Sequence, residues 1–375
     1  MKRIALYIHI PFCVSKCAYC NFCSFVPKTN QIEKYIEALL KEIELVSQSI
    51  NAEIFSIYVG GGTPSVLPQG DLKKIFDAIY QHFKVLPKVS VTIEANPNSF
   101  SLEKAQEYVK CGCNRVSFGL QSADKGLLKV LNRAHDFQDC VNAVNNAKKV
   151  GIDDINVDVL LGVPTQTQAI LTDTLQKIVS LPITHVSAYG LILEDNTALF
   201  RQIETGKLSL PSEDETVDMY ESTVSFLDKH GFSRYEISNF AQSGFESVHN
   251  LNYWARGEFI GLGLNAYSFI NGVHYRNTSD FKSYCENLLA GKLCHVEKEK
   301  ETLKTKIEET IMLALRTSKG LDIAEFNQKF HVDFEKKYEK VLSKLKKLDL
   351  IKLEHGFLVI KNMYVSNSVI TEFFE

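Results

Sequence analysis

The stretch HIPFCVSKCAYCNFCSF, residues 9–25, places four cysteines within eleven positions, directly after an apolar run that is typical of a strand. Cys13, Cys17 and Cys20 have the spacing C-x3-C-x2-C, and Cys23 follows three positions later. Three thiolates on a loop can converge on one metal centre, and soft sulfur ligands select zinc, copper(I) or iron–sulfur clusters. The stretch therefore predicts a metal centre near the start of the chain.

The choice between a zinc ion and a cluster depends on a fourth ligand. A structural zinc site normally adds a second C-x2-C pair or a histidine pair downstream, and neither is evident in the sequence. Cys23 would crowd a single tetrahedral site together with Cys20 and the earlier pair. We therefore favour a cluster with three protein ligands and one open position, and interpret Cys23 as a spare thiol, with a redox or secondary-ligand role as the alternative. The other cysteines are expected to be ordinary core or surface residues: Cys111, Cys113, Cys140, Cys285 and Cys294.

Short apolar runs alternate with helical patterns on both sides of this stretch and over the first two thirds of the chain. Between the apolar runs, apolar residues recur at helical spacing. Six such βα units predict an α/β fold, with a parallel sheet and helical crossovers, either open or curled into a partial barrel. The predicted strands cover residues 5–9, 54–59, 89–94, 115–119, 155–160 and 185–190.

The composition changes after Glu194, where polar residues and loops become more frequent. The segment EDETVDMYESTVSFLDKHGF still predicts a helix that ends at Gly231. From Glu297 the chain is charged and helical, and IKLEHGFLVI predicts two strands around a tight turn at His355 and Gly356. This combination of helices and a hairpin resembles a small winged-helix domain. We predict three segments: a core domain at 1–235, a connecting region at 236–299 and a C-terminal domain at 300–375.

The overall composition narrows the class of protein. The chain has 375 residues, 45% of them hydrophobic, and a net charge of −3, so it can bury a large core and shows no overall basic character. The lysines between residues 336 and 347 are interrupted by Glu339 and flanked by further acids, which indicates a solvated helix face rather than a nucleic-acid site. The first residues lack the pattern of a signal peptide, and no apolar run approaches the ~20 residues that span a bilayer. We expect a cytoplasmic protein without a nucleic-acid partner.

Polar or glycine-rich groups lie at the carboxyl ends of several of the predicted strands. The loop GGGTPS, residues 60–65, follows the second strand, Glu94 ends the third and Gln121 follows the fourth. Arg133 lies after the next helical stretch, and Asp158 stands within the apolar fifth strand, where an unpaired charge would be costly. Since the carboxyl ends of parallel strands meet at one edge, we expect these groups to line a ligand site, although the glycine loop alone could be a plain turn.

The cysteine spacing, with Tyr19 just before the last cysteine, resembles the signature of the radical S-adenosylmethionine (radical SAM) family. The resemblance implies a [4Fe–4S] cluster held by Cys13, Cys17 and Cys20, whose fourth iron binds S-adenosylmethionine (SAM). It also implies a partial (β/α)6 barrel, similar to a TIM barrel, with a small helical, winged-helix-like domain at the C-terminus. Matching positions imply SAM contacts by Tyr7, Tyr19, Gly61, Gly62, Thr63, Glu94, Gln121, Arg133 and Asp158.

Longer motifs resemble one group within that family. YIHIPFC, GGGTP, EANP, NRVSFGLQS, NVDVLLGVP and HNLNYW are similar to motifs of the oxygen-independent coproporphyrinogen III oxidase and of its relative, the HemW-type haem chaperone. The residues from about 300 onward look like the C-terminal, HemN-like domain of this group. Phe22 stands where the oxidase has a fourth cysteine, and this difference favours the chaperone.

The segment HNLNYW resembles the haem motif of the chaperone and implies that His249 is an axial ligand of the haem iron. Tyr253 and Trp254, the only tryptophan of the chain, could pack on the macrocycle. The alternative is a buried histidine whose hydrogen bonds are satisfied within the protein. Tyr267 stands where the family usually has a histidine, and its phenol is a poor substitute for an iron-binding imidazole.

The resemblance therefore implies a haem chaperone that binds a [4Fe–4S] cluster, SAM and haem and delivers haem to an acceptor protein at the membrane. It also implies an electron donor such as flavodoxin. The alternative is a true enzyme, an oxygen-independent coproporphyrinogen III oxidase of porphyrin biosynthesis, so whether the chain is an enzyme stays open at this point. A nucleic-acid-linked regulator that uses the C-terminal domain is a third reading, against which the mild net charge speaks.

Overall fold

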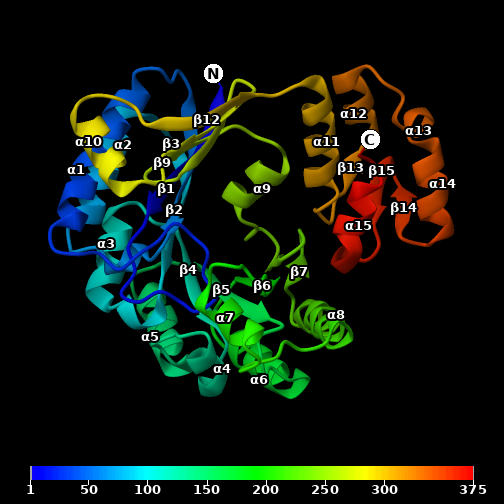
Figure 1. Cartoon of the computed structure of the whole chain (residues 1–375), viewed down its shortest axis with the longest axis horizontal. Coiled ribbons are helices and arrows are strands. Elements are labelled where there is room, and N and C mark those ends of the chain that lie inside the picture. Colours follow the sequence, from blue (N-terminus) through cyan, green and yellow to red (C-terminus); the bar gives the residue numbers. More distant parts are fainter. Residues whose placement is uncertain (1, 375) are drawn as a thin grey trace.

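Six parallel strands, arranged in sequence order, form the centre of a curved twelve-stranded sheet in the computed structural model, which describes residues 2–374 (Figure 1). Each contains one of the predicted strands, so that part of the fold prediction is confirmed. Neighbouring strands pair in parallel from the first to the last of them. The strands are β1 (Arg3–Ile10), β2 (Glu53–Gly61), β3 (Lys84–Ala95), β4 (Arg115–Gln121), β5 (Asp154–Leu161) and β6 (His185–Gly190).

Helices connect these strands and lie along the outer side of the sheet (Figure 1). In the first of them, Tyr35, Leu39 and Ile43 repeat every four residues and are fully buried, because this stripe faces the sheet. Side-chain caps at Ser101 and Thr167 fix where two of the later helices begin. The crossover helices are α1 (Gln31–Ser47), α2 (Asp71–His82), α3 (Leu102–Lys110), α4 (Lys125–Val130), α5 (Phe137–Lys149) and α6 (Gln168–Val179).

The sheet continues beyond both edges of this parallel centre. The strand β9 (Phe259–Leu262) pairs in parallel with β1, and antiparallel β10 (Tyr267–Ile270), β11 (Val273–Asn277) and β12 (His295–Lys300) follow it. At the other edge, β8 (Asn239–Ala241) and β7 (Ser233–Arg234) run antiparallel to β6. None of these six strands was predicted, although Asn271 and Gly272, both with positive φ, form the kind of turn that Asn-Gly favours between β10 and β11.

One short helix lies on the inner side of the curved sheet. This helix, α9 (Val248–Trp254), contacts β2 on one side and α11 (Leu303–Ala314) on the other (Figure 1). The other helices of this region are α7 (Ala198–Glu204), α8 (Glu213–Lys229) and α10 (Phe281–Leu289). The predicted end of α8 at Gly231 is confirmed to within two residues, and this glycine has φ 83°.

The C-terminal segment forms a small helical unit beside the sheet (Figure 1). A three-stranded sheet with the order β13–β15–β14 packs against its helices, which is the topology of a winged helix. The predicted turn is present, because His355 and Gly356 both have positive φ between β14 and β15. The elements after α11 are β13 (Leu321–Asp322), α12 (Ile323–Phe330), α13 (Phe334–Lys337), α14 (Glu339–Lys347), β14 (Ile351–Glu354), β15 (Phe357–Ile360) and α15 (Ser366–Thr371).

Within residues 2–374, no helix has both the length and the apolar character that crossing a bilayer requires. The bounds of the three segments at 1–235, 236–299 and 300–375 stay a prediction.

Candidate functional site

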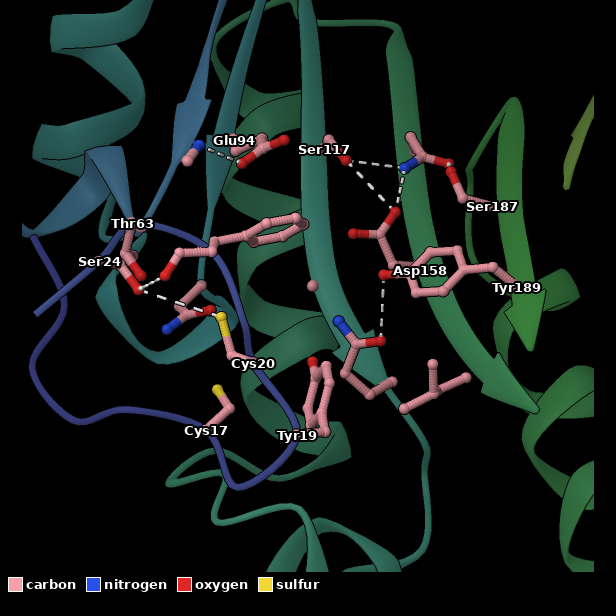
Figure 2. Close-up of a pocket in the computed structure, with 18 of the residues that line it drawn as sticks. Cys17, Tyr19, Cys20, Ser24, Thr63, Glu94, Ser117, Asp158, Ser187 and Tyr189 are labelled. Carbon is pink, nitrogen blue, oxygen red and sulfur yellow. Dashed lines mark hydrogen bonds between the residues drawn. The ribbon is translucent and has the colours of Figure 1, made fainter. Parts of the chain in front are cut away.

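A cavity of about 560 Å³ lies between the cysteine-rich loop and the inner side of the strands β2 to β6 (Figure 2). We call it the cysteine-loop cavity. Every site residue predicted from the sequence lines it, with the exception of Tyr7 and His249. Residues that the chain separates widely are thus brought to one place: Cys13, Cys17, Tyr19, Cys20, Gly61, Gly62, Thr63, Glu94, Gln121, Arg133 and Asp158.

Hydrogen bonds to main-chain carbonyl oxygens fix the conformation of the cysteine-rich loop. The Cys13 N–H donates to the carbonyl oxygen of Phe25 at 3.0 Å, and the Phe25 N–H donates to that of Pro11 at 2.8 Å. Lys16 Nζ donates to the carbonyl oxygens of Phe22 and Ser24 at 2.9 and 3.0 Å. Because none of these bonds uses a cysteine side chain, the thiols are left available for a metal centre, and none of the nine is in a disulfide.

The thiols of Cys13, Cys17 and Cys20 line one cavity and are not gathered as the ligands of a single ion would be. In a tetrahedral zinc site with Zn–S of about 2.3 Å, the sulfur atoms lie roughly 3.8 Å apart. Among the described residues, the cysteines form no group of three with ligand atoms within 4.8 Å of one another. Iron–sulfur clusters are held by cysteine thiolates, and these three thiols are of that kind. Burial raises the pKa of the Cys13 thiol, a cost that metal binding would remove.

Arg133 connects the cysteine loop to β4. Its Nη1 donates to Sγ of Cys17 at 3.2 Å, and its Nη2 donates to Oδ1 of Asn96 at 2.7 Å and to the carbonyl oxygen of Gly119. Its Nε is buried without a hydrogen-bond partner in the described part of the chain. A guanidinium with one unsatisfied donor at the cavity wall is suited to a ligand carboxylate.

The glycine-rich loop packs directly on the cysteine loop. The Gly62 N–H donates to the Ile10 carbonyl oxygen at 2.7 Å, and the Thr63 N–H donates to that of Phe12 at 2.8 Å. A Cβ at Gly62 would lie 2.6 Å from the Phe12 oxygen, and a Cβ at Gly60 would lie 2.8 Å from the Glu94 carboxyl carbon. Glycine is therefore required here for close contact between protein segments.

Two buried carboxyl groups face the cysteine-loop cavity. Glu94 accepts hydrogen bonds from the Tyr58 hydroxyl at 2.8 Å and from the Gly61 N–H at 3.2 Å, and burial raises its pKa to about 7. Asp158 accepts a hydrogen bond from Asn156 Nδ2 at 2.7 Å, and burial raises its pKa to about 6. The amide of Asn156 thus offsets part of the cost that Asp158 would have as an unpaired charge.

Further polar residues line the inner side of β4 to β6, and Ser117, Ser187 and Tyr189 among them were missed in the sequence. Gln121, with φ 72°, accepts a hydrogen bond from the Tyr189 hydroxyl at 3.3 Å. In Figure 2, Ser117, Asp158, Ser187 and Tyr189 lie along neighbouring strands and face the cavity. Their signal in the sequence is the alternation of polar and apolar residues in HVSAYG, which places His185, Ser187 and Tyr189 on one face of β6.

Tyr7 lies in a second cavity, on the other side of Glu94. This cavity has a volume of about 620 Å³ and is lined by residues of β1, β9, β10 and α11. We call it the α11 cavity. The Tyr7 hydroxyl is 3.0 Å from Nδ1 of His9, whose Nε2 is 2.8 Å from the Cys23 carbonyl oxygen. Cys23 also lines the α11 cavity rather than the cysteine-loop cavity. A SAM contact by Tyr7 stays a prediction.

His249 lines neither cavity. It is a buried histidine whose ring nitrogens both have hydrogen-bond partners within the protein, which was the alternative interpretation of the HNLNYW segment. Its Nδ1 is 2.8 Å from the Ser56 hydroxyl and its Nε2 is 2.8 Å from the Tyr253 hydroxyl. The side chain is buried, and burial lowers its pKa to about 3, so the ring is neutral. Iron coordination by His249 stays a prediction, and it requires one of these two hydrogen bonds to break.

Comparisons with known proteins define the class. The family model described as the Radical SAM superfamily matches residues 7–178, and the model described as the HemN C-terminal domain matches residues 302–361. The solved structure of coproporphyrinogen III oxidase (HemN) from Escherichia coli superposes with a TM-score of 0.89 over 99% of this chain and 90% of that chain, at 22% identity. The predicted α/β radical SAM fold is confirmed.

Curated relatives narrow the class to one family. The heme chaperone HemW of Lactococcus lactis is 36% identical over 92% of this chain and 89% of its own length, and that of Bacillus subtilis is 33% identical over 92% of both chains. A heme chaperone HemW of Mycobacterium tuberculosis is 32% identical over 86% of this chain. The chain belongs to the HemW family within the radical SAM superfamily, as the resemblance of its motifs had indicated.

Proposed function

We propose that this protein is a haem chaperone, which binds a [4Fe–4S] cluster, SAM and haem and delivers haem to acceptor proteins. The observation that carries the proposal is the match to relatives named heme chaperones over almost the whole chain, up to 36% identity across 92% of it. An acceptor at the membrane and an electron donor such as flavodoxin belong to the same proposal.

The cysteine-loop cavity supports the two resident cofactors. Cys13, Cys17 and Cys20 would hold the cluster, whose open iron supplies a binding point for the amino and carboxylate groups of SAM. Glu94 and Asp158 offer carboxylates that can accept hydrogen bonds from the amino N–H groups or the ribose hydroxyls. These side chains bind and orient the nucleoside, while the surrounding strands limit its contact with water.

The alternative activity, coproporphyrinogen III oxidation, is less supported. The likeness to the E. coli oxidase, at 22% identity, concerns the fold. Phe22, which is 68% exposed, stands where the resemblance places the fourth cysteine of the oxidase, and phenylalanine cannot contribute a thiol.

One experiment separates the two functions. The protein is reconstituted anaerobically with iron and sulfide and then given haem in one arm, and coproporphyrinogen III with SAM and a reductant in the other. We expect a new Soret band in the first arm, transfer of that haem to an apoprotein acceptor, and no decarboxylated porphyrinogen in the second. Formation of protoporphyrinogen would identify an oxidase, and the absence of haem binding would overturn the chaperone.

A further inference from the structure

A series of hydrogen bonds runs from the Asp158 carboxylate, in the cysteine-loop cavity (Figure 2), to the start of α9. Asn156 Nδ2 donates to Oδ1 of Asp158 at 2.7 Å, and Asn156 Oδ1 is 2.6 Å from Nδ1 of His185. Nε2 of His185 is 2.8 Å from the Tyr235 hydroxyl, and that hydroxyl accepts a hydrogen bond from the Ser247 N–H at 3.2 Å. We call this series the Asp158–Ser247 network. Of its residues, only Asp158 is a predicted SAM contact.

The charge of Asp158 fixes the direction of every bond in this network. An ionised carboxylate only accepts hydrogen bonds, so the amide nitrogen of Asn156 faces it and the amide oxygen faces His185. That oxygen needs a donor, which makes Nδ1 of His185 the protonated nitrogen and Nε2 the acceptor. Burial holds the pKa of His185 well below its usual range, so the ring is neutral and has this single donor. The Tyr235 hydroxyl therefore donates to Nε2 of His185 and accepts from the Ser247 N–H.

Donors that all point toward one negative charge strengthen one another. Each bond polarises the next, and the effect is largest where water is excluded. Asn156, His185 and Ser247 are all buried. The amide of Asn156 does not take up and release protons, so the network holds groups in place and does not conduct protons. A change in the charge at Asp158 therefore alters the strength of the hydrogen bond that holds the Ser247 N–H.

Tyr235 is a firm support for the start of α9. Its N–H donates to the Asn239 carbonyl oxygen at 3.1 Å, and its carbonyl oxygen accepts a hydrogen bond from the Ser318 N–H at 3.0 Å. Both β8 and the segment after α11 thus hold the main chain of Tyr235. The residue lines neither the cysteine-loop cavity nor the α11 cavity. The effect of a ligand on Tyr235 must therefore pass through the neighbours of its hydroxyl group.

The start of α9 is formed by the last residue of the network. Ser247 caps this helix, because its hydroxyl accepts a hydrogen bond from the Asn250 N–H at 3.3 Å. His249, the predicted haem ligand, follows two positions later, and the helix ends at Trp254. Trp254 is the only tryptophan of the chain and is partly exposed. Its fluorescence therefore reports on the surroundings of α9 alone.

We propose that Tyr235 and His185 are positioning residues, which connect the start of α9 to the Asp158 carboxylate and hold it there as long as no ligand hydroxyl binds that carboxylate. A ribose hydroxyl of SAM that donates to Asp158 takes up part of its charge, and the bonds of the network become weaker. The start of α9, and with it His249, is then held less firmly. The proposal rests on the proposed function, because SAM and haem come from there, and adds how the SAM site acts on α9.

The fluorescence of Trp254 tests the proposal without haem. The cluster-loaded protein is titrated with SAM, and equilibrium dialysis verifies that the site is saturated. We expect the emission of the wild type to shift as SAM binds. Tyr235→Phe removes the hydroxyl from the network, so its emission without SAM should already resemble that of the SAM-bound wild type, and SAM should add little. Asp158→Asn removes the charge at the other end of the network and should have the same emission without SAM.

Tyr220→Phe is the matched control. The Tyr220 hydroxyl donates to the Ile237 carbonyl oxygen at 2.9 Å, two positions from Tyr235 in the sequence but outside the network. We expect this variant to respond to SAM as the wild type does. Circular dichroism and the absorbance of the reconstituted cluster verify that the variants fold. A full response to SAM in Tyr235→Phe, or no response in the wild type, would overturn the proposal.

Measurements with haem distinguish this inference from the function beneath it. We expect SAM to speed the transfer of haem from the wild type to apomyoglobin, and Tyr235→Phe to transfer haem at the faster rate with or without SAM. If the emission responds to SAM as expected but the wild type acquires no Soret band, the chaperone function fails and the positioning role stands. If haem is bound and transferred but SAM changes neither the emission nor the rate, the function stands and the positioning role fails.

Discussion

Nη1 of Arg133 lies 3.2 Å from Sγ of Cys17, although 116 positions separate the two residues in the chain. The neighbouring Asn132 donates from its side chain to the carbonyl oxygen of Lys16 at 2.9 Å, so the segment after α4 and the cysteine loop are joined twice. The geometry of the proposed metal centre therefore depends on a segment that carries none of its proposed ligands.

This contact predicts the effect of replacing Arg133. Lysine keeps the positive charge but cannot bind Cys17, Asn96 and the Gly119 carbonyl at the same time, as the guanidinium does. We expect Arg133→Lys to lose its cluster several-fold faster when an iron chelator is added, followed as the decay of the iron–sulfur absorbance. As a control, Lys129→Arg changes a residue of the same region that lines no part of the cysteine-loop cavity. Equal decay rates for Arg133→Lys and the wild type would contradict the prediction.

The four cysteines of the loop should differ in their effect on iron content. Cys13, Cys17 and Cys20 line the cysteine-loop cavity, while Cys23 lines the α11 cavity. We expect alanine at any of the first three to abolish the broad iron–sulfur absorbance after anaerobic reconstitution, and Cys23→Ala to retain it. Iron and sulfide analyses provide the measurement. A loss of the same size in Cys23→Ala would show that the ligands are assigned wrongly.

The affinity for SAM should decrease as the pH falls through the pKa of Glu94. Burial raises this pKa to about 7, so the carboxylate that would bind a cationic ligand is mostly ionised at about pH 8 and mostly protonated at about pH 6. Through the contact with Glu94 alone, the dissociation constant for SAM should rise on the order of tenfold as the pH falls from about 8 to about 6. Equilibrium dialysis with the cluster-loaded protein measures it.

Two variants verify the origin of this pH dependence. Glu94→Gln should bind SAM weakly and with little dependence on pH above about 6.5, since the titrating carboxyl group is gone. Asp158→Asn should keep the dependence near pH 7, because the pKa of Asp158 is about 6. An unchanged pH profile in Glu94→Gln would assign the titration to another group.

Gly62 should be intolerant of a side chain. A Cβ there would meet the carbonyl oxygens of Phe12 and Ile10 at 2.6 and 2.9 Å, and these are backbone atoms that cannot move aside cheaply. We expect Gly62→Ala to destabilise the protein by about 2 kcal/mol or more, seen as a lower Tm. Gly190→Ala is the matched control, since a Cβ at that position would have no heavy atom of the described residues within 4 Å beyond its chain neighbours. A Tm for Gly62→Ala as high as that of Gly190→Ala would show that the two loops can separate.

The parallel centre of the sheet could be predicted because its signals are local. Apolar runs at regular spacing, separated by amphipathic segments, identified β1 to β6, and the His355–Gly356 turn identified the hairpin of the C-terminal unit. The strands β9 to β12 were missed. The pairing of β9 with β1 joins residues about 250 positions apart in the chain, and a four-residue strand with two glycines nearby carries little pattern of its own.

The site residues also fall into two groups, those that the sequence could place and those that it could not. Residues at strand ends, such as Glu94 and Asp158, could be placed because parallel strands share one edge, and the structure brings them together. Tyr7 and His249 could not be placed by this rule. Tyr7 lies within β1 rather than at its carboxyl end. The position of His249 depends on how α9 packs against β2, where Ser56 meets His249, and such a tertiary contact leaves no periodic signal in the sequence.

The position of α9 has a thermodynamic consequence. Ser247 and Asn250, at the start of this helix, line the cysteine-loop cavity, and Tyr253, near its end, lines the α11 cavity. A ligand that tilts or tightens the helix from one end alters the room available at the other. Linkage then requires reciprocity: by whatever factor an occupant of the first cavity changes the affinity of the second, the second occupant changes the affinity of the first by the same factor.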